Sequence, residues 1–117
     1  MLKIYGLKNC DTCRTARKWL TAKDVPHEFF DLREMPLDAE TIRHWLAQVG
    51  LDTLLNKRGT TWRKLDDSDK ELLDKTKAVQ LMLTHPALIK RPVFCRDGKI
   101  SVGFAKDEND RGHLLGG

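Results

Sequence analysis

The strongest constraint on the fold of this chain is the change of hydrophobic periodicity between residues 2 and 32. Residues 2–5 alternate as a strand does, and Gly6 follows them. From 11 to 23 the pattern becomes helical, because one face of the cylinder carries Ala16, Trp19, Leu20 and Lys23. Val25-Pro26 ends that helix, and residues 27–32 form a second predicted strand. The β-α-β order predicts a parallel pair of strands joined by a right-handed crossover.

The middle of the chain is predicted to be helical. A helix is expected over 38–49, where acids crowd the first turn and Gly50 stops the pattern. Shorter helical stretches are expected over 51–56, 66–75 and 76–84. Since this block carries no strand pattern, residues 36–85 are interpreted as a helical insertion.

The end of the chain returns to strands. Residues 92–96 and 99–102 flank Asp97-Gly98, a dipeptide typical of hairpin turns, and a last helix is expected over 106–115. The summed order is β-α-β, helices, β-β-α. It predicts an α/β chain of thioredoxin-like arrangement, one domain over 1–117 with the insertion between its second and third strands. The order by itself leaves other α/β and α+β folds open.

Composition narrows the class of protein. The 117 residues are 40% hydrophobic and 32% charged with a net charge of +4, which favours anionic partners without choosing among them. No apolar run is long enough to span a membrane, and the N-terminus lacks the pattern of a signal peptide. We therefore expect a cytoplasmic protein without a membrane anchor. The basic residues lack interleaved aromatic residues, so nucleic acid is not an expected partner.

The chemistry is concentrated at Cys10 and Cys13, which lie between the first strand and the first helix. Backbone amides and the dipole at a helix start stabilise a thiolate, and Lys8 and Arg14 add positive charge nearby. Cys10 is thus the predicted nucleophile. Cys13, one turn further on, can attack a mixed disulfide formed on Cys10.

Two alternatives compete with a reactive pair. Both cysteines could be buried, inert side chains, although a polar strand–helix junction is a poor place for them. They could also be half of a zinc site, but the remaining candidates, Cys95 and four histidines, form no second close pair. We therefore predict no metal. Cys95 is interpreted as a core or edge residue of a strand.

Two basic segments are further candidates for binding. Residues 54–65 include Arg58 and Gly59 and could form an anion-binding loop, or equally an ordinary basic loop anchored by Trp62. Pro92 precedes a strand, and in a thioredoxin-like fold this position holds a cis-proline that faces the reactive cysteine. Arg91 would then point toward Cys10; the alternative is a trans proline at the start of an edge strand.

Several short motifs occur in a specific order: Tyr5-Gly6, Asn9-Cys10-Asp11-Thr12, Leu54-Leu55-Asn56…Arg58-Gly59, Ile89-Lys90-Arg91-Pro92 and Gly103-Phe104. Together they resemble the ArsC/Spx family, most closely its YffB-like branch, over nearly the whole chain. The resemblance implies a thioredoxin-like fold with a helical insertion. It also implies that Cys10 matches the cysteine of arsenate reductases, and that Arg58 and Arg91 match two of their three oxyanion-binding arginines.

The departures from that pattern shape the expected function. The 102–104 stretch has no arginine to match the third one, which favours a thiol substrate over arsenate. The resemblance then implies a thiol–disulfide oxidoreductase with glutathione as co-substrate and no bound cofactor. We expect this protein to be a monomer. Its catalytic residues would be Cys10 and Cys13, and its substrate would be glutathione or a protein thiol or disulfide. The anion would be held by Arg58, Arg91, Asn9 and Arg14.

Two other functions stay open. Arsenate reductases lack a cysteine at position 13, whereas Spx regulators carry C-x-x-C as a redox switch on a protein that binds RNA polymerase. A redox-sensing regulator with a protein partner is therefore one alternative, and arsenate reduction is the other.

Overall fold

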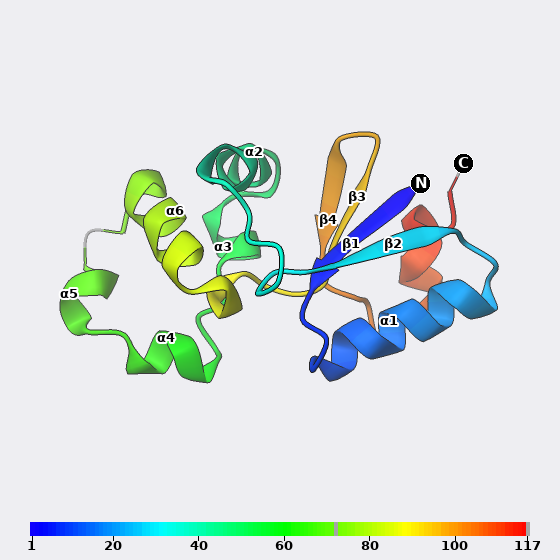
Figure 1. Cartoon of the computed structure of the whole chain (residues 1–117), viewed down its shortest axis with the longest axis horizontal. Coiled ribbons are helices and arrows are strands. Elements are labelled where there is room, and N and C mark those ends of the chain that lie inside the picture. The colour runs from blue at the N-terminus through cyan, green and yellow to red at the C-terminus, as the bar shows by residue number, and fades with distance from the viewer. Residues whose placement is uncertain (72, 117) are drawn as a thin grey trace. The chain divides into compact units, whose positions relative to one another are not determined.

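A computed structural model describes residues 1–71 and 73–116 of the chain. The chain divides into two compact units, one made of residues 1–35 with the chain from 91 onward, the other of residues 36–90 (Figure 1). The second unit covers the predicted insertion and extends a little beyond it. Within the described ranges, no helix combines the length and apolar character that crossing a membrane requires.

The first unit is built on a four-stranded sheet of order β2-β1-β3-β4. Its strands are β1 (Leu2–Gly6), β2 (His27–Asp31), β3 (Val93–Arg96) and β4 (Lys99–Val102). As predicted, β1 and β2 pair in parallel, with Ile4 opposite Phe29, whereas β3 runs antiparallel to β1. Asp97 and Gly98 both have positive φ, which gives the turn the twist that a tight hairpin needs. The sheet is mixed, and the fold is α/β and thioredoxin-like.

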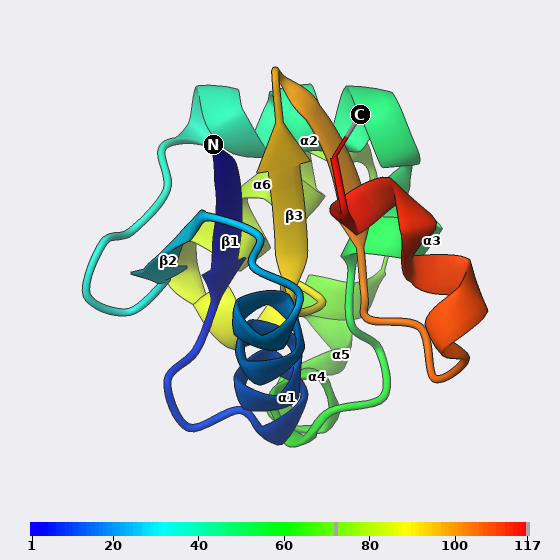
Figure 2. The ribbon, with the colours of Figure 1, turned by 90° about the vertical axis from the view of Figure 1, so that its right-hand side faces the viewer.

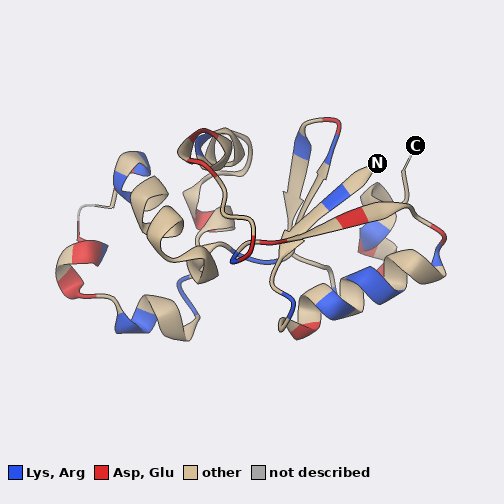
Figure 3. Ribbon diagram, in the orientation of Figure 1, with Lys and Arg blue, Asp and Glu red and all other residues tan. Residues whose placement is uncertain are grey.

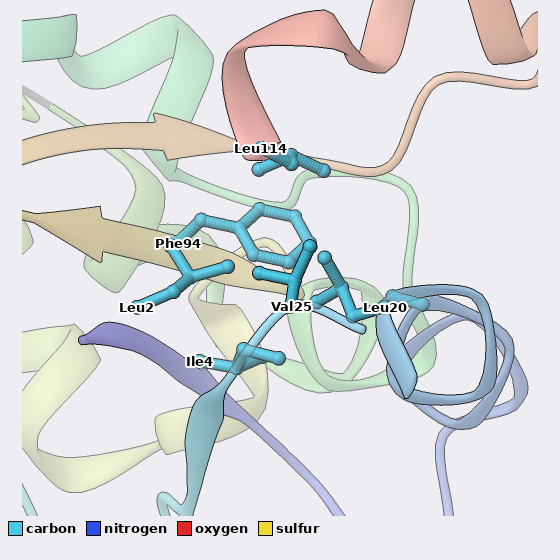
Figure 4. Close-up of a cluster of buried hydrophobic side chains, with 7 residues drawn as sticks. Leu2, Ile4, Leu20, Val25, Phe94 and Leu114 are labelled. Carbon is cyan, nitrogen blue, oxygen red and sulfur yellow. The ribbon is translucent and has the colours of Figure 1, made fainter. Parts of the chain in front are cut away.

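One face of this sheet is covered by α1 (Asp11–Ala22) and by the 3₁₀ helix η2 (Glu108–Leu114). Figure 2 shows α1 in front of β1 and β3. The core between them, drawn in Figure 4, contains Leu2, Ile4, Ala16, Leu20, Val25, Phe94 and Leu114. Burying each large apolar side chain contributes about 1.5–3 kcal/mol, so this cluster holds α1 in a defined register on the strands. Cys10 and Cys13 are positioned by that packing.

The second unit contains α2 (Ala39–Val49), α3 (Leu51–Leu54), α4 (Thr60–Lys64), α5 (Asp67–Lys70), α6 (Lys75–Thr84) and the 3₁₀ helix η1 (Pro86–Leu88). Its largest helices, α2 and α6, pack together, and both contribute buried side chains: Ile42 and Trp45 from α2, Val79 and Met82 from α6. Asp38 caps α2, because its carboxylate accepts a hydrogen bond from the Thr41 amide at 2.8 Å. Aspartate is one of the residue types expected at a helix start.

The predicted helix over 66–75 is wrong apart from α5; its Leu72 lies outside the described residues. The acidic run does not continue as a helix, because Asp74 caps α6 instead, accepting from the Lys77 amide at 2.8 Å. The Lys77 ammonium donates to the carbonyls of Ser68 and Glu71 at 2.5 and 2.6 Å, and so satisfies the end of α5.

Two further sequence expectations need correction. Residues 60–64 were expected to be loop but form α4, and Trp62 is only half-buried, with the ammonium groups of Lys57 and Lys70 over its ring. The last helix is a 3₁₀ helix, shorter than the predicted 106–115. Contacts outside the helix, from Glu108 to the Trp19 indole and from Arg111 to the Ala105 carbonyl, set its path where local propensity is poor.

Candidate functional site

Cys10 occupies the N-cap position of α1, with extended backbone angles. Its amide donates to the Leu7 carbonyl at 3.1 Å, and its carbonyl accepts from the Arg14 amide at 3.0 Å, so the residue joins loop to helix. The side chain is half-buried. A sulfur at this position faces the amides of the first turn, which have no partner inside the helix.

The pKa of Cys10 lies below its ordinary value. Burial by itself raises it, but the Cys13 amide, the Cys13 thiol and the Arg91 guanidinium all interact with the sulfur and lower it more. The two cations named from the sequence are engaged elsewhere: Lys8 pairs with Glu34 at 2.6 Å, and Arg14 pairs with Asp11. The charge that acts on Cys10 is therefore that of Arg91.

Arg91 reaches the site because the start of β3 lies opposite the end of β1, where Val93 pairs with Tyr5. The peptide bond between Arg91 and Pro92 is cis, as the sequence predicted, and Pro92 is buried. The Pro92 carbonyl accepts from the Gly103 amide at 2.8 Å, which ties the start of β3 to the chain after β4. Arg91 stands two residues before β3, and its guanidinium interacts with the Cys10 sulfur at the start of α1.

Cys13 differs from Cys10 in both burial and pKa, the two properties that decide how reactive a thiol is. Its side chain is fully buried, and burial together with the Cys10 sulfur raises its pKa to about 11, against opposing interactions with the Leu7 amide and Arg91. Its thiolate fraction at pH 7 is on the order of one in ten thousand. The site therefore contains one thiol poised to ionise and one that stays protonated and donates to it.

Asp31 is a residue of the site that the sequence did not single out. It is the one buried charged side chain within the described ranges, at 9% exposure, and ends β2. Its carboxylate accepts from the Lys8 amide at 2.8 Å and from the Arg33 amide at 2.8 Å. Because Lys8 lies in the loop before Cys10, Asp31 holds that loop against the end of β2. An acid at a strand end, directly before a turn, was the only available signal.

Replacing Asp31 with asparagine is expected to lower the free energy of unfolding by about 1–3 kcal/mol, because a charged acceptor of backbone amides is lost. Burial raises the pKa of Asp31, but the amides of Lys8, Arg33 and Glu34 lower it below its ordinary value. The stabilisation is thus complete above the ordinary Asp pKa and is lost as pH falls through the lowered one.

Urea unfolding of wild type and Asp31→Asn at several acidic pH values measures this. In Asp31→Asn, the free energy of unfolding should fall less steeply than in wild type as the pH is lowered through the acidic range. Glu34→Gln is the matched control, since the Glu34 side chain is exposed and its ion pair with Lys8, screened by solvent, contributes little to stability. An Asp31→Asn profile parallel to that of wild type would contradict the role assigned to Asp31.

Gly6 is the second residue whose importance emerges only in three dimensions. It is buried at the end of β1, where a Cβ would overlap the Cys13 sulfur and stand 3.4 Å from the Phe29 ring. The strand can pass this close to α1 only without a side chain.

Gly6→Ala is expected to destabilise the protein by about 1–3 kcal/mol through overpacking. The clash is specific, so Cys13→Ala should relieve part of it and the two changes should be less than additive. Urea unfolding of the two single variants, the double variant and wild type gives the coupling energy. Additive changes would show that Cys13 is not what Gly6 accommodates.

With this geometry in place, comparison with known proteins identifies the family. The ArsC family model matches residues 5–111, which include both cysteines, Arg91 and Pro92. The chain belongs to the ArsC family.

Solved structures and curated relatives agree with that membership. The structure of a protein named YFFB is 41% identical and superposes with a TM-score of 0.91, covering 99% of this chain and 100% of that one. An arsenate reductase (ArsC) related protein from Brucella melitensis is 42% identical, with a TM-score of 0.79 and coverage of 96% and 93%. The global transcriptional regulator Spx of Listeria innocua is 29% identical over 92% of this chain and 83% of its own length.

The structure groups most of the predicted site residues of this ArsC-family chain. Cys10, Cys13 and Arg91 belong to one unit and interact at the start of α1. Pro92 follows Arg91 in the same unit, and Asn9, which precedes Cys10, is exposed. Arg14 is exposed on the first turns of α1.

Arg58 belongs to the other unit, where its side chain is exposed and its amide donates to Asn56 Oδ1 at 3.0 Å. Its role in binding an anion stays a prediction. Across residues 1–71 and 73–116, no three His, Cys, Asp or Glu side chains come together as potential metal ligands.

Proposed function

We propose that this protein is a thiol–disulfide oxidoreductase in which Cys10 is the nucleophile and glutathione is the co-substrate. The single observation that carries the proposal is the position of Cys10 at the N-cap of α1, where its half-buried thiol meets Cys13 and the Arg91 guanidinium. These groups lower the pKa of Cys10 against the opposing effect of burial. Membership of a family that includes arsenate-reductase-related proteins supports a thiol-based, reductase-like activity.

The proposed reaction has two exchange steps. The Cys10 thiolate attacks the glutathione sulfur of a mixed disulfide, forms a Cys10–glutathione disulfide and displaces the substrate thiolate, which takes a proton from water. A second glutathione thiolate then attacks the glutathione sulfur on Cys10. Glutathione disulfide leaves, and the Cys10 thiolate is restored. Arg91, whose guanidinium interacts with the Cys10 sulfur, is proposed to hold a glutathione carboxylate, and Arg58, Asn9 and Arg14 are proposed to assist.

The high pKa of Cys13 favours glutathione over Cys13 as the group that resolves the mixed disulfide. Burial is the largest cause of that pKa, and burial persists when Cys10 has lost its charge in the mixed disulfide. Cys13 thus serves as donor to Cys10 more than as attacking thiol. The reaction needs no bound cofactor, and it suits a monomer in a cytoplasm that supplies reduced glutathione.

Steady-state turnover of a glutathione mixed disulfide, coupled to glutathione reductase, tests the proposal. Wild type should turn over, and Cys13→Ser should keep most of the activity because a serine hydroxyl still donates to Cys10. No turnover by wild type would reject the enzyme. Loss of activity in Cys13→Ser would instead assign the resolving step to Cys13.

Two other functions have specific support. Similarity to Spx, together with the paired cysteines, favours a redox-sensing regulator that binds a protein partner. Pull-down from lysate with oxidised and reduced protein separates this from the enzyme. The arsenate-reductase-related neighbours favour arsenate as a substrate, which a direct assay with glutathione and glutaredoxin checks.

A further inference from the structure

One face of α1 carries a basic groove of which the proposed chemistry uses only Arg14. It is a shallow pocket of about 500 Å³ lined by Arg14, Arg17, Lys18, Thr21, Ala22 and His27. Bands of Lys and Arg along α1 are visible in Figure 3. Among its lining residues there is no carboxylate.

The groove leads away from the reactive sulfur. Positions 14, 17, 18 and 21 follow one another at helical spacings of three and four, and position 10 begins the same stripe. From residue 10 to residue 21 the helix rises about 16 Å. A ligand whose sulfur sits at Cys10 can therefore extend along α1 and keep meeting cationic side chains.

Most of the cationic side chains in this groove keep their charge available for a ligand, because, in the part of the chain that the structure describes, they are not paired with neighbouring acidic residues. The Arg17 guanidinium stacks 4.4 Å from the centre of the Phe29 ring, which fixes its position and leaves its charge available. Lys18 is exposed. Among residues 1–71 and 73–116, the one acidic partner of a cation in this groove is Asp11, which pairs with Arg14 and whose own side chain is 91% exposed. Such pairs contribute little and exchange readily for an incoming carboxylate.

We propose that this groove is a docking site for an acidic segment of a protein substrate, adjacent to the disulfide that Cys10 attacks. The inference rests on the proposed function and names its substrate class. An extended chain advances about 3.3 Å per residue, so roughly five residues span the groove, more than glutathione provides. The cationic lining selects carboxylates, and steering by such a surface raises association rates about 10-fold to 10³-fold.

The test compares three peptides that each carry one cysteine, activated as a mixed disulfide with thionitrobenzoate, beside five glutamates, five glutamines or five lysines. Cys10 attacks the peptide sulfur, the peptide–thionitrobenzoate bond breaks, and the coloured thiolate leaves with the electron pair. We expect the glutamate peptide to react at least about tenfold faster than the glutamine peptide at low salt, with the advantage shrinking as salt screens the groove. Mass spectrometry confirms the peptide adduct on Cys10.

Lys18→Glu is the decisive variant, and Lys99→Glu is its matched control because it changes net charge equally at an exposed position of β4. The rate ratio between glutamate and glutamine peptides should collapse in Lys18→Glu and persist in Lys99→Glu. Equal rates for all three peptides, or equal losses in both variants, would overturn the docking site and leave the enzyme proposal standing.

Direct binding keeps the two proposals separable. Fluorescence anisotropy of a cysteine-free glutamate peptide should show binding to wild type that weakens at least about fivefold in Lys18→Glu, whether or not Cys10 reacts. Failure of every disulfide to react would reject the enzyme and leave this measurement to decide the groove. Tighter binding of a single-stranded oligonucleotide of equal charge, also lost in Lys18→Glu, would overturn the assignment to an acidic protein segment.

Discussion

Cys10→Ser is expected to reduce turnover of a glutathione mixed disulfide to the uncatalysed background, a fall of about 10³-fold or more. A serine hydroxyl at the same N-cap position cannot ionise near neutral pH, so the exchange loses its nucleophile. In the same variant, iodoacetamide should leave the peptide that contains residues 10 and 13 unmodified, because Cys13 is buried and protonated, and any remaining alkylation should map to the half-buried Cys95.

The pH dependence of alkylation gives this prediction its second measurement. In Cys13→Ser, the alkylation rate of Cys10 should rise with pH and level off with a midpoint below the ordinary thiol pKa, since interactions with residue 13 and Arg91 outweigh burial. A midpoint at the ordinary value would identify Cys10 as an inert thiol. Residual turnover in Cys10→Ser would assign the nucleophile to another residue.

The ionisation of Cys10 also makes folding stability depend on pH. Its folded pKa is lower than its unfolded pKa, so its contribution is complete above the unfolded value and is lost as pH falls through the folded value. Between the two values, stability of reduced wild type should rise with pH relative to Cys10→Ser. A stability difference that does not change with pH would show that Cys10 ionises equally easily in the folded and unfolded protein, so that the fold does not stabilise its thiolate.

Arg91→Met is expected to have the second-largest effect, slowing alkylation of Cys10 at neutral pH by about tenfold. Methionine preserves much of the length and removes both the hydrogen bond and the charge that reach the sulfur. A charge-assisted hydrogen bond contributes about 1.5–3 kcal/mol, so its loss returns Cys10 toward the thiol form. The midpoint of the alkylation profile should move upward by a corresponding amount.

Arg91→Lys is the control that distinguishes charge from geometry. Lysine restores the charge without the planar fork, so it should recover part of the rate. Arg58→Met, in the other unit, tests whether anion binding and thiolate stabilisation are separate: it should leave the alkylation midpoint unchanged and raise the KM for glutathione substrates. Identical profiles of alkylation rate against pH for wild type and Arg91→Met would show that the Cys13 amide and thiol are enough to lower the pKa of Cys10 without Arg91.

Local patterns were enough to predict the elements nearest the site. Strand alternation before Gly6, helical periodicity after Cys10 and the Asp97-Gly98 turn predicted β1, α1 and the β3–β4 hairpin, because each pattern depends on neighbours close in sequence. The weaker helices were predicted less well. Contacts from Lys77 to α5 and from Glu108 to Trp19 override propensity there, and those partners are distant in sequence or belong to other elements.

By itself, the sequence determined that Cys10 stands at a strand–helix junction and that the chain has an ArsC-like order of motifs. Only the tertiary structure decided which groups act on that cysteine. Arg91, rather than Lys8 or Arg14, reaches the sulfur, because the strand order places the start of β3 beside β1. Asp31 and Gly6 matter for the same reason. Their partners, Lys8 and Cys13, come near only when the parallel β1–β2 pair and the packing of α1 bring the ends of separate segments together.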